Sequence, residues 1–260
     1  MTEGLVRYDA RDGVAILTIA QAAKLNAMSF GMWEVLPELV RRAETDPSVR
    51  VIVLRGEGEK AFCAGADISQ FGEKRSEAEA IADYDRVVER GNAALRGAEK
   101  PTVALVRGIC FGGGLGLAIA CDLRFASSDS RFRIPAARLG LGYGFSNVKM
   151  LVSRLGRGVT ADLLLSARIV DAGEAVALGI VNAVRNPSDF EEEAARYVER
   201  IAHNAPLTLK AVKRALAELE TSEPDAAAVD ALVAACYASR DYHEGRAAFR
   251  DKREPLFTGE

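Results

Sequence analysis

Three consecutive glycines, residues 112–114, stand between a predicted strand and a predicted helix. The strand expected over residues 101–108 is rich in aliphatic and β-branched residues, and the helix expected over residues 115–120 is small and apolar. Glycines allow a sharp turn and let a ligand touch the main chain, while the first amides of a helix have no intrahelical partner. Amides in that position stabilise an anion or a developing oxyanion.

Taken alone, the glycine turn favours simple tight packing over an anion site, because such turns before helices are common. No Gly-Lys-Ser or Gly-Lys-Thr follows it, as a phosphate-binding loop requires. No clear acidic partner downstream completes a dinucleotide-binding pattern either. A second motif is therefore needed before any chemistry is assigned to this turn.

That second motif is Ala64-Gly65-Ala66-Asp67, which follows a strand expected over residues 49–56. Together with the glycine turn and the ending Cys121-Asp122, it resembles the enoyl-CoA hydratase/isomerase family, the crotonase superfamily, in order and spacing. The resemblance covers nearly the whole chain, including the tail over residues 244–257. Several separated motifs in the right order are far more specific than any one of them.

The resemblance implies that the backbone amides of Ala66 and Gly113 form an oxyanion hole that grips the carbonyl of a CoA thioester. Lys24 is placed near the adenine and ribose of CoA, although a solvated lysine explains that residue equally well. No metal is expected, and CoA enters as part of the substrate rather than as a cofactor. The expected substrate-binding residues are Lys24, Leu25, Ala27, Ala64, Asp67, Ile68, Gly112, Gly116, Ala136, Leu141, Lys252 and Phe257.

The residues that move protons in the family's hydratases are missing here. Those hydratases use two glutamates, and the resemblance places the corresponding positions at Gly116 and Ala136. Residues 101–121 and 130–161 contain no Asp or Glu at all. Because hydration requires a carboxylate within hydrogen-bond reach, we expect weak hydration unless a lid acid such as Glu73 or Glu77 reaches the site.

Tyr143 is the conspicuous polar group left, between Gly142 and Gly144. A malonyl-type CoA decarboxylase branch of the family has a tyrosine at the matching point, and loss of carbon dioxide delivers the enolate without a base. That branch has a histidine where Ala66 stands here, so Tyr143 as a wall of the acyl pocket remains the simpler interpretation. Three functions stay open: a hydratase/isomerase-family lyase or isomerase, a decarboxylase using Tyr143, and a non-catalytic acyl-CoA binding protein.

The composition is typical of a cytoplasmic enzyme. The chain carries 34 Lys and Arg against 37 Asp and Glu, so its net charge of −3 indicates neither nucleic acid nor an anionic membrane as a partner. The start of the chain has no signal-peptide pattern, and no uncharged apolar run is long enough to span a membrane. The four cysteines, Cys63, Cys110, Cys121 and Cys236, lack metal-ligand spacing and are expected to be reduced, most of them buried.

The elements that must position these groups alternate between strands and helices up to residue 188. A hairpin is expected over residues 5–19, followed by a helix over residues 30–43 that Ser29 caps and Trp33 anchors in the core. Ser146 and Asp171 are expected to cap later helices. Further helices are predicted over residues 81–98, 146–155, 160–166 and 172–178, and further strands over residues 123–126, 131–134 and 179–184.

From residue 189 onward no strand pattern remains, and three helices are expected over residues 190–204, 207–220 and 225–239. We therefore divide the chain into an α/β acyl-CoA-binding core, residues 1–188, and a C-terminal helical region, residues 189–260. The resemblance implies that the core is a spiral of ββα turns and that the helical region trimerises, giving a homotrimer or homohexamer. Apolar residues in excess of one packed face support a partner copy, whose site Lys252 and Phe257 would help complete.

Overall fold

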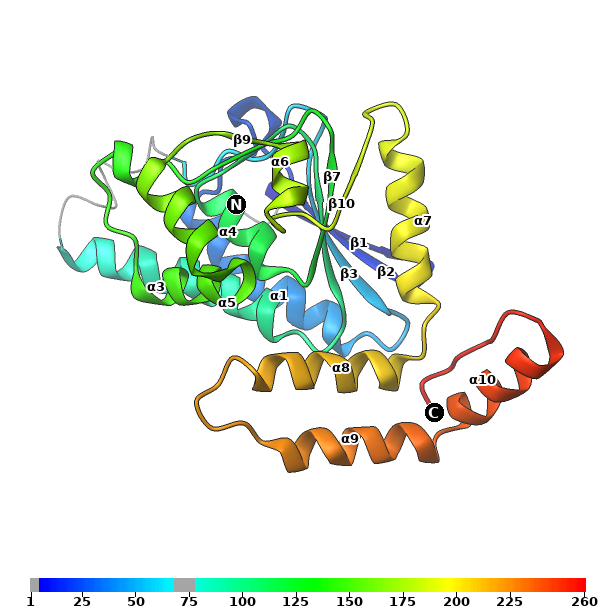
Figure 1. Ribbon diagram of the computed structural model, residues 1–260. Coiled ribbons are helices and arrows are strands. Elements are labelled where there is room, and N and C mark those ends of the chain that lie inside the picture. Colours follow the sequence, from blue (N-terminus) through cyan, green and yellow to red (C-terminus); the bar gives the residue numbers. More distant parts are fainter. Residues whose placement is uncertain (1–4, 68–77) are drawn as a thin grey trace.

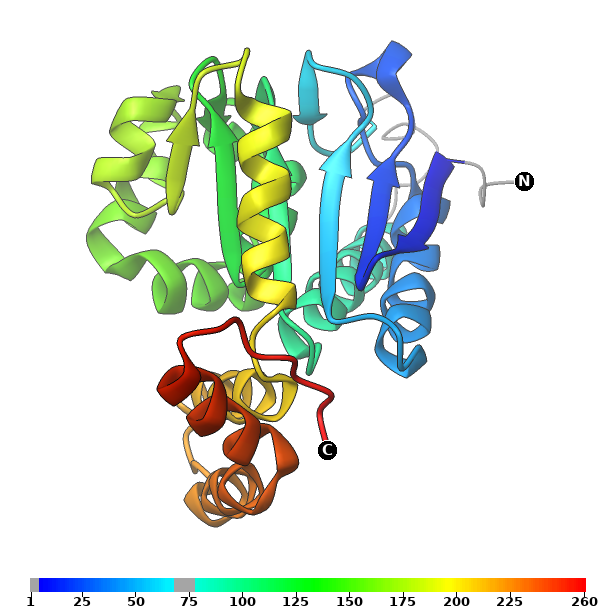
Figure 2. The same ribbon diagram turned by 90° about the vertical axis from the view of Figure 1, so that its right-hand side faces the viewer.

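The fold consists of two sets of strands with helices packed around them, as Figures 1 and 2 show. The computed structural model describes residues 5–67 and 78–260, so Ile68, Glu73 and Glu77 lie outside the described residues. A six-stranded sheet has the order β1 (Val6–Arg11), β2 (Val14–Ile19), β3 (Val51–Gly56), β5 (Thr102–Val106), β7 (Leu123–Ser127) and β10 (Ala183–Arg185). A four-stranded sheet has the order β4 (Ala61–Cys63), β6 (Ile109–Phe111), β8 (Arg131–Arg133) and β9 (Val170–Asp171).

A repeated ββα unit builds both sheets, which confirms the predicted α/β spiral. In successive turns β3 and β4, β5 and β6, and β7 and β8 each place their first strand in the larger sheet and their second in the smaller one. The predicted hairpin is present, because β1 pairs antiparallel with β2. The remaining pairs of this sheet, β2–β3, β3–β5, β5–β7 and β7–β10, are parallel. Each turn then continues into a helix that covers the sheets.

Both faces of the larger sheet are buried, which explains why its central strands are almost uniformly apolar. In β3, Ile52 and Leu54 face the main core, whereas Val51 and Val53 join a second cluster on the opposite face. The helix α7 (Phe190–Ala202) supplies the other half of that cluster and lies across the sheet in Figure 2. The first helix after residue 188 thus packs on the sheet, and the division at that residue stays a prediction.

The helices of the core begin largely where the sequence predicts. The Ser29 hydroxyl accepts a hydrogen bond from the Met32 amide, and the Asp171 carboxylate accepts one from the Glu174 amide. Ser146 does not cap its helix: Gly144 is the N-cap residue, so the exposed Ser146 lies inside the first turn. The helices are α1 (Phe30–Thr45), α3 (Ala78–Gly97), α4 (Gly113–Ala120), α5 (Phe145–Ala161) and α6 (Ala172–Ala177), with a short helical turn over Asp162–Ser166.

The C-terminal region contains one helix more than the sequence pattern predicted. It consists of α7 and three further helices, α8 (Pro206–Glu218), α9 (Ala226–Ala238) and the additional α10 (Arg240–Asp251). In Figure 1, α8 lies beside the core, and α9 and α10 lie farther from it. The structure describes every residue of α9, and none of its side chains is buried. Phe249 of α10 is 88% exposed. Within residues 5–67 and 78–260, none of the helices is long and apolar enough to cross a membrane.

Candidate functional site

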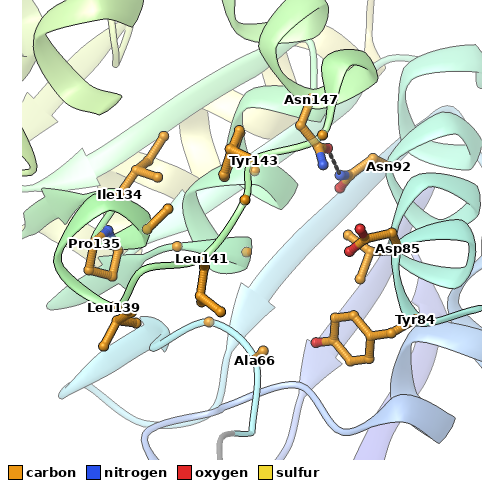
Figure 3. Close-up of a pocket in the computed structure, with 18 of the residues that line it drawn as sticks. Ala66, Tyr84, Asp85, Asn92, Ile134, Pro135, Leu139, Leu141, Tyr143 and Asn147 are labelled. Atoms are coloured by element: carbon orange, nitrogen blue, oxygen red, sulfur yellow. Dashed lines mark hydrogen bonds between the residues drawn. The ribbon is translucent and has the colours of Figure 1, made fainter. Parts of the chain in front are cut away.

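A pocket opens between α3, α4 and the segment that joins β8 to α5, as Figure 3 shows. It lies on the side of the sheets that α1 also covers, and the Ala64–Ala66 turn after β4 forms part of its wall. The predicted site residues that line it are Ala64, Ala66, Gly112, Gly113, Gly116, Ala136, Leu141 and Tyr143. Both motifs on which the sequence argument rested therefore meet at one cavity.

Ala66 and Gly113 both line this pocket, and neither backbone N–H has an acceptor among the residues that the structure describes. The Met28 amide donates to the Gly65 carbonyl (2.7 Å), and the Asp67 amide donates to the Met28 carbonyl (3.0 Å). Ala66 lies between these two residues in sequence, and its own N–H takes part in neither bond. Gly113 is the first residue of α4, where no intrahelical acceptor exists for its amide. Across the part of the chain that the structure describes, neither amide donates a hydrogen bond.

The two amides are also close to each other. A Cβ atom built on Gly113 would lie 3.9 Å from the Ala66 nitrogen, and one built on Gly65 would lie 3.5 Å from the Gly113 nitrogen. The nitrogen atoms of Ala66 and Gly113 therefore lie near each other at the wall of the pocket. Such an arrangement stabilises negative charge that develops on a carbonyl oxygen.

The structure explains why glycine occupies Gly112 and Gly114 of the triplet. Gly112 adopts a φ of 52°, a left-handed conformation that favours glycine, and its amide donates to the Arg133 carbonyl (2.8 Å). A Cβ on Gly114 would lie 2.3 Å from the Cys63 carbonyl oxygen, so only glycine allows α4 to approach β4 this closely. The packing role predicted for the turn thus resides in Gly114, and the Gly113 amide remains available to a ligand.

Trp33 of α1 sets the spacing of the helices behind the pocket. Its side chain is 1% exposed and belongs to the main core, as the sequence predicted. A Cβ on Gly91 of α3 would lie 3.0 Å from the indole Cε3, and one on Gly113 would lie 3.2 Å from Cζ2. The ring is therefore held between two glycine backbones, one on α3 and one at the start of α4.

The positions of the missing glutamates do line the pocket. A Cβ on Gly116 would meet only the Asn92 amide nitrogen, at 3.8 Å, and Ala136 presents a methyl group. Among the described residues that line the pocket, Asp85 of α3 carries the one carboxylate. Its side chain points into the cavity in Figure 3.

The sequence analysis missed Asp85 and its neighbours on α3. Tyr84, Asp85, Val88 and Asn92 all line the pocket, and their spacing places them on one helical face. That spacing is visible in the sequence. The family resemblance places the hydratase acids only at Gly116 and Ala136, and this face of α3 belongs to neither motif.

Tyr143 lies on the wall of the pocket and packs against the main core. Burial raises the pKa of its phenol to about 12, so the group is protonated at neutral pH. A protonated phenol can donate a hydrogen bond or a proton but cannot act as a base.

Residues 24–27 brace the Ala66 turn from outside the pocket. The Lys24 ammonium is 2.7 Å from the carboxylate of Asp67, which is 7% exposed, so this lysine is ion-paired and not merely solvated. The Leu25 carbonyl accepts a hydrogen bond from the Ala64 amide (3.0 Å), and Ala27 is buried. This loop is thus fixed to the motif that carries the Ala66 amide.

Lys252 and Phe257 lie away from the pocket, in the C-terminal region. Lys252 ends α10 in a left-handed conformation and is exposed. Phe257 lines a second, apolar hollow between α8, α9 and α10. The structure does not bring these residues to the pocket of the same chain, and their role at a neighbour's site stays a prediction.

Three cysteines are buried near the two motifs, as predicted. Cys63, Cys110 and Cys121 are free thiols in the core, and burial raises the pKa of Cys63 and of Cys121 to about 12. A thiol with so high a pKa carries almost no nucleophilic thiolate at neutral pH. These cysteines therefore contribute packing and not chemistry.

Comparisons with known proteins agree with this geometry. The sequence model of a family described as "Enoyl-CoA hydratase/isomerase" matches residues 9–260. A short-chain-enoyl-CoA hydratase of Clostridium acetobutylicum is 33% identical over 244 residues, which cover 93% of this chain and 92% of that protein. A crotonyl-CoA hydratase of Syntrophomonas wolfei is 31% identical and covers 96% of each chain. The crystal structure of an enoyl-CoA hydratase/carnithine racemase from Magnetospirillum magneticum superposes with a TM-score of 0.93 at 34% identity, covering 98% of this chain and 96% of that one.

Proposed function

Because this chain belongs to the enoyl-CoA hydratase/isomerase family of CoA-thioester enzymes, we propose that it binds an acyl-CoA thioester with the carbonyl oxygen between the Ala66 and Gly113 amides. The observation that supports this proposal most directly is the pair of unused amides at one pocket. Donors that are fixed in advance stabilise an enolate oxygen without reorganising during the reaction. The Gly113 amide adds the positive end of the α4 dipole.

The rate of hydration depends on groups that can transfer protons. Gly116 and Ala136 carry no titratable group, and the amides of Asn92 and Asn147 hold a polar group without removing its proton. We therefore propose that the enolate is stabilised well but that hydration of crotonyl-CoA is slow. Asp85, as the pocket's carboxylate, is the first residue to test for any rate that remains.

A decarboxylase acting on a malonyl-type thioester is the second candidate, favoured by the buried, protonated Tyr143. In that reaction the bond between the α-carbon and the carboxylate breaks and carbon dioxide leaves. Its electron pair becomes the enolate, and a proton returns to the α-carbon. The site then needs a proton donor and no base. The decarboxylase branch of the family has a histidine where Ala66 stands here, which places this candidate second.

The deciding experiment measures binding and turnover with butyryl-CoA, crotonyl-CoA and malonyl-CoA, using free CoA as the control for the thioester carbonyl. Binding of all three thioesters with slow crotonyl-CoA turnover is the expected result. Turnover of malonyl-CoA alone selects the decarboxylase, and binding without any turnover selects a non-catalytic acyl-CoA binding protein. If no thioester binds more tightly than free CoA, the proposed carbonyl site is wrong.

We also propose that the protein assembles as a homotrimer or homohexamer. The exposed apolar side chains Leu219, Tyr237 and Phe249 of the C-terminal region support this proposal, because unpartnered apolar surface of this kind favours an interface. In such an assembly Lys252 and Phe257 would contribute to the CoA site of a neighbouring copy. No cofactor beyond the CoA of the substrate is part of the proposal.

A further inference from the structure

Two asparagines face each other across the acyl end of the pocket, where the missing glutamates leave space. Asn92 comes from α3 and Asn147 from the first turns of α5. The Asn92 amide nitrogen donates to the Asn147 amide oxygen at 3.3 Å, the contact drawn as a dashed line in Figure 3. The Asn92 side chain also lies beside Gly116. Gly116 follows Gly113 by about one turn of α4, a distance of about 5 Å along the helix axis.

The pair does not use its full hydrogen-bonding capacity. Asn92 is 1% exposed, yet its amide oxygen is buried and accepts no hydrogen bond in the part of the chain that the structure describes. The Asn147 amide nitrogen likewise donates to no group in the hydrogen bonds of those residues. If the oxygen and nitrogen positions of both side-chain amides are exchanged, Asn147 becomes the donor and Asn92 the acceptor. One donor and one acceptor still remain without a partner. A buried amide oxygen without a partner is costly and indicates a missing ligand group.

From this unused donor and acceptor we propose that Asn92 and Asn147 form a specificity subsite that binds a hydroxyl group on the acyl chain of the substrate. The inference rests on the proposed function, because that function places an acyl chain in this pocket. A hydroxyl donates to the Asn92 oxygen and accepts from the Asn147 nitrogen, so it satisfies both amides at once. The distance along α4 places this hydroxyl within a few carbons of the thioester.

Charged substituents fit the subsite less well. A carboxylate offers only acceptors, so it leaves the Asn92 oxygen without a donor. An ammonium group offers only donors and leaves the Asn147 nitrogen facing another N–H. The pair thus discriminates by the kind of hydrogen bond and not by charge.

The test compares dissociation constants of butyryl-CoA, both enantiomers of 3-hydroxybutyryl-CoA, and 4-hydroxybutyryl-CoA by titration calorimetry. At least one hydroxyacyl thioester should bind ~10-fold more tightly than butyryl-CoA, the size of effect that one or two net hydrogen bonds produce. In Asn92→Leu and in Asn147→Leu this preference, measured against butyryl-CoA in the same variant, should fall to about twofold or less. Asn186→Leu, at an exposed position on the loop before α7, is the matched control and should keep the preference.

Thermal unfolding without ligand provides a second readout. Asn92→Leu removes a buried amide with an unpaired oxygen, so its melting temperature should equal or exceed that of the parent. If that variant does not fold, the half-buried Asn147→Leu carries the same comparison. Equal affinities for butyryl-CoA and every hydroxyacyl thioester would show that the pair holds water only. A preference that survives in both leucine variants would also overturn the proposal. Failure of every thioester to bind would instead refute the proposed function.

Discussion

Replacing Gly113 by alanine tests the proposed carbonyl site with a single methyl group. The new Cβ would lie 3.9 Å from the Ala66 nitrogen, while a carbonyl oxygen bound to that amide needs to lie about 2.9 Å from it. The methyl group therefore lies close to the place where the proposed carbonyl oxygen would meet the Ala66 amide. It also lies 3.2 Å from Cζ2 of Trp33, so the ring has to shift by a few tenths of an ångström.

The expected effect on binding is larger than the effect on the fold. Loss of the carbonyl's hydrogen bonds should weaken butyryl-CoA binding by about 1.4 kcal/mol, or ~10-fold. Free CoA has no thioester carbonyl, so its affinity should change by about twofold or less. Stability should change by about 1 kcal/mol or less, because the contact with Trp33 is tight and the rest of the site is open pocket.

Two further glycine variants complete the design. Gly114→Ala places its Cβ 2.3 Å from the backbone oxygen of Cys63, which cannot move aside, so about 1–3 kcal/mol or more of stability should be lost. Gly158→Ala in α5 meets nothing within 4 Å and should leave binding and folding intact. The measurements are calorimetric titrations and urea unfolding of each variant. The reasoning fails if Gly113→Ala binds butyryl-CoA as the parent does, or if it loses free CoA by the same factor.

Three more outcomes are expected. Crotonyl-CoA should be hydrated at well below about 10 s⁻¹, and Asp85→Asn should abolish what remains; a rate at or above that value would show that a carboxylate has replaced the missing pair. Any malonyl-CoA decarboxylation should be lost in Tyr143→Phe and should not decline up to about pH 10 in the parent, because burial raises the phenol's pKa to about 12. Because the pKa is raised in the folded state, the phenol contributes to the free energy of unfolding below about pH 10. This contribution should disappear as the pH rises toward 12, and Tyr143→Phe should show no such pH-dependent loss of stability. Light scattering should give a multiple of three of the 27.9 kDa chain, and truncation after Ser239 should weaken CoA binding; a single-chain mass with full affinity would falsify the shared site.

Local patterns were sufficient for the elements that bury an obvious face. The buried strands, the hairpin and the Ser29 and Asp171 caps follow from periodicity and hydrogen-bonding residues close in sequence. Ser146 was assigned wrongly because Gly144, without any side chain, begins the helix and a serine nearby resembles a cap. The helix over Arg240–Asp251 was missed because its charged sequence has only a narrow apolar face.

The pocket itself depended on contacts between distant segments. The two amides were predicted from the family resemblance, and the structure places them together because Gly114 lets α4 approach β4. Asn92 meets Asn147 only because α3 and α5 both pack against α4. The acyl end of the site is therefore determined by tertiary packing and not by any motif that the sequence displays.

The position of Trp33 provides an internal reporter for this site. The chain contains a single tryptophan, so its fluorescence arises from one place. That indole lies against the Gly113 backbone on one edge and against α3 on the other. Its emission should therefore change when a thioester enters the pocket, without any attached dye. Stopped-flow mixing would then separate the arrival of the acyl group from later bond-making steps, in a protein that carries its own label.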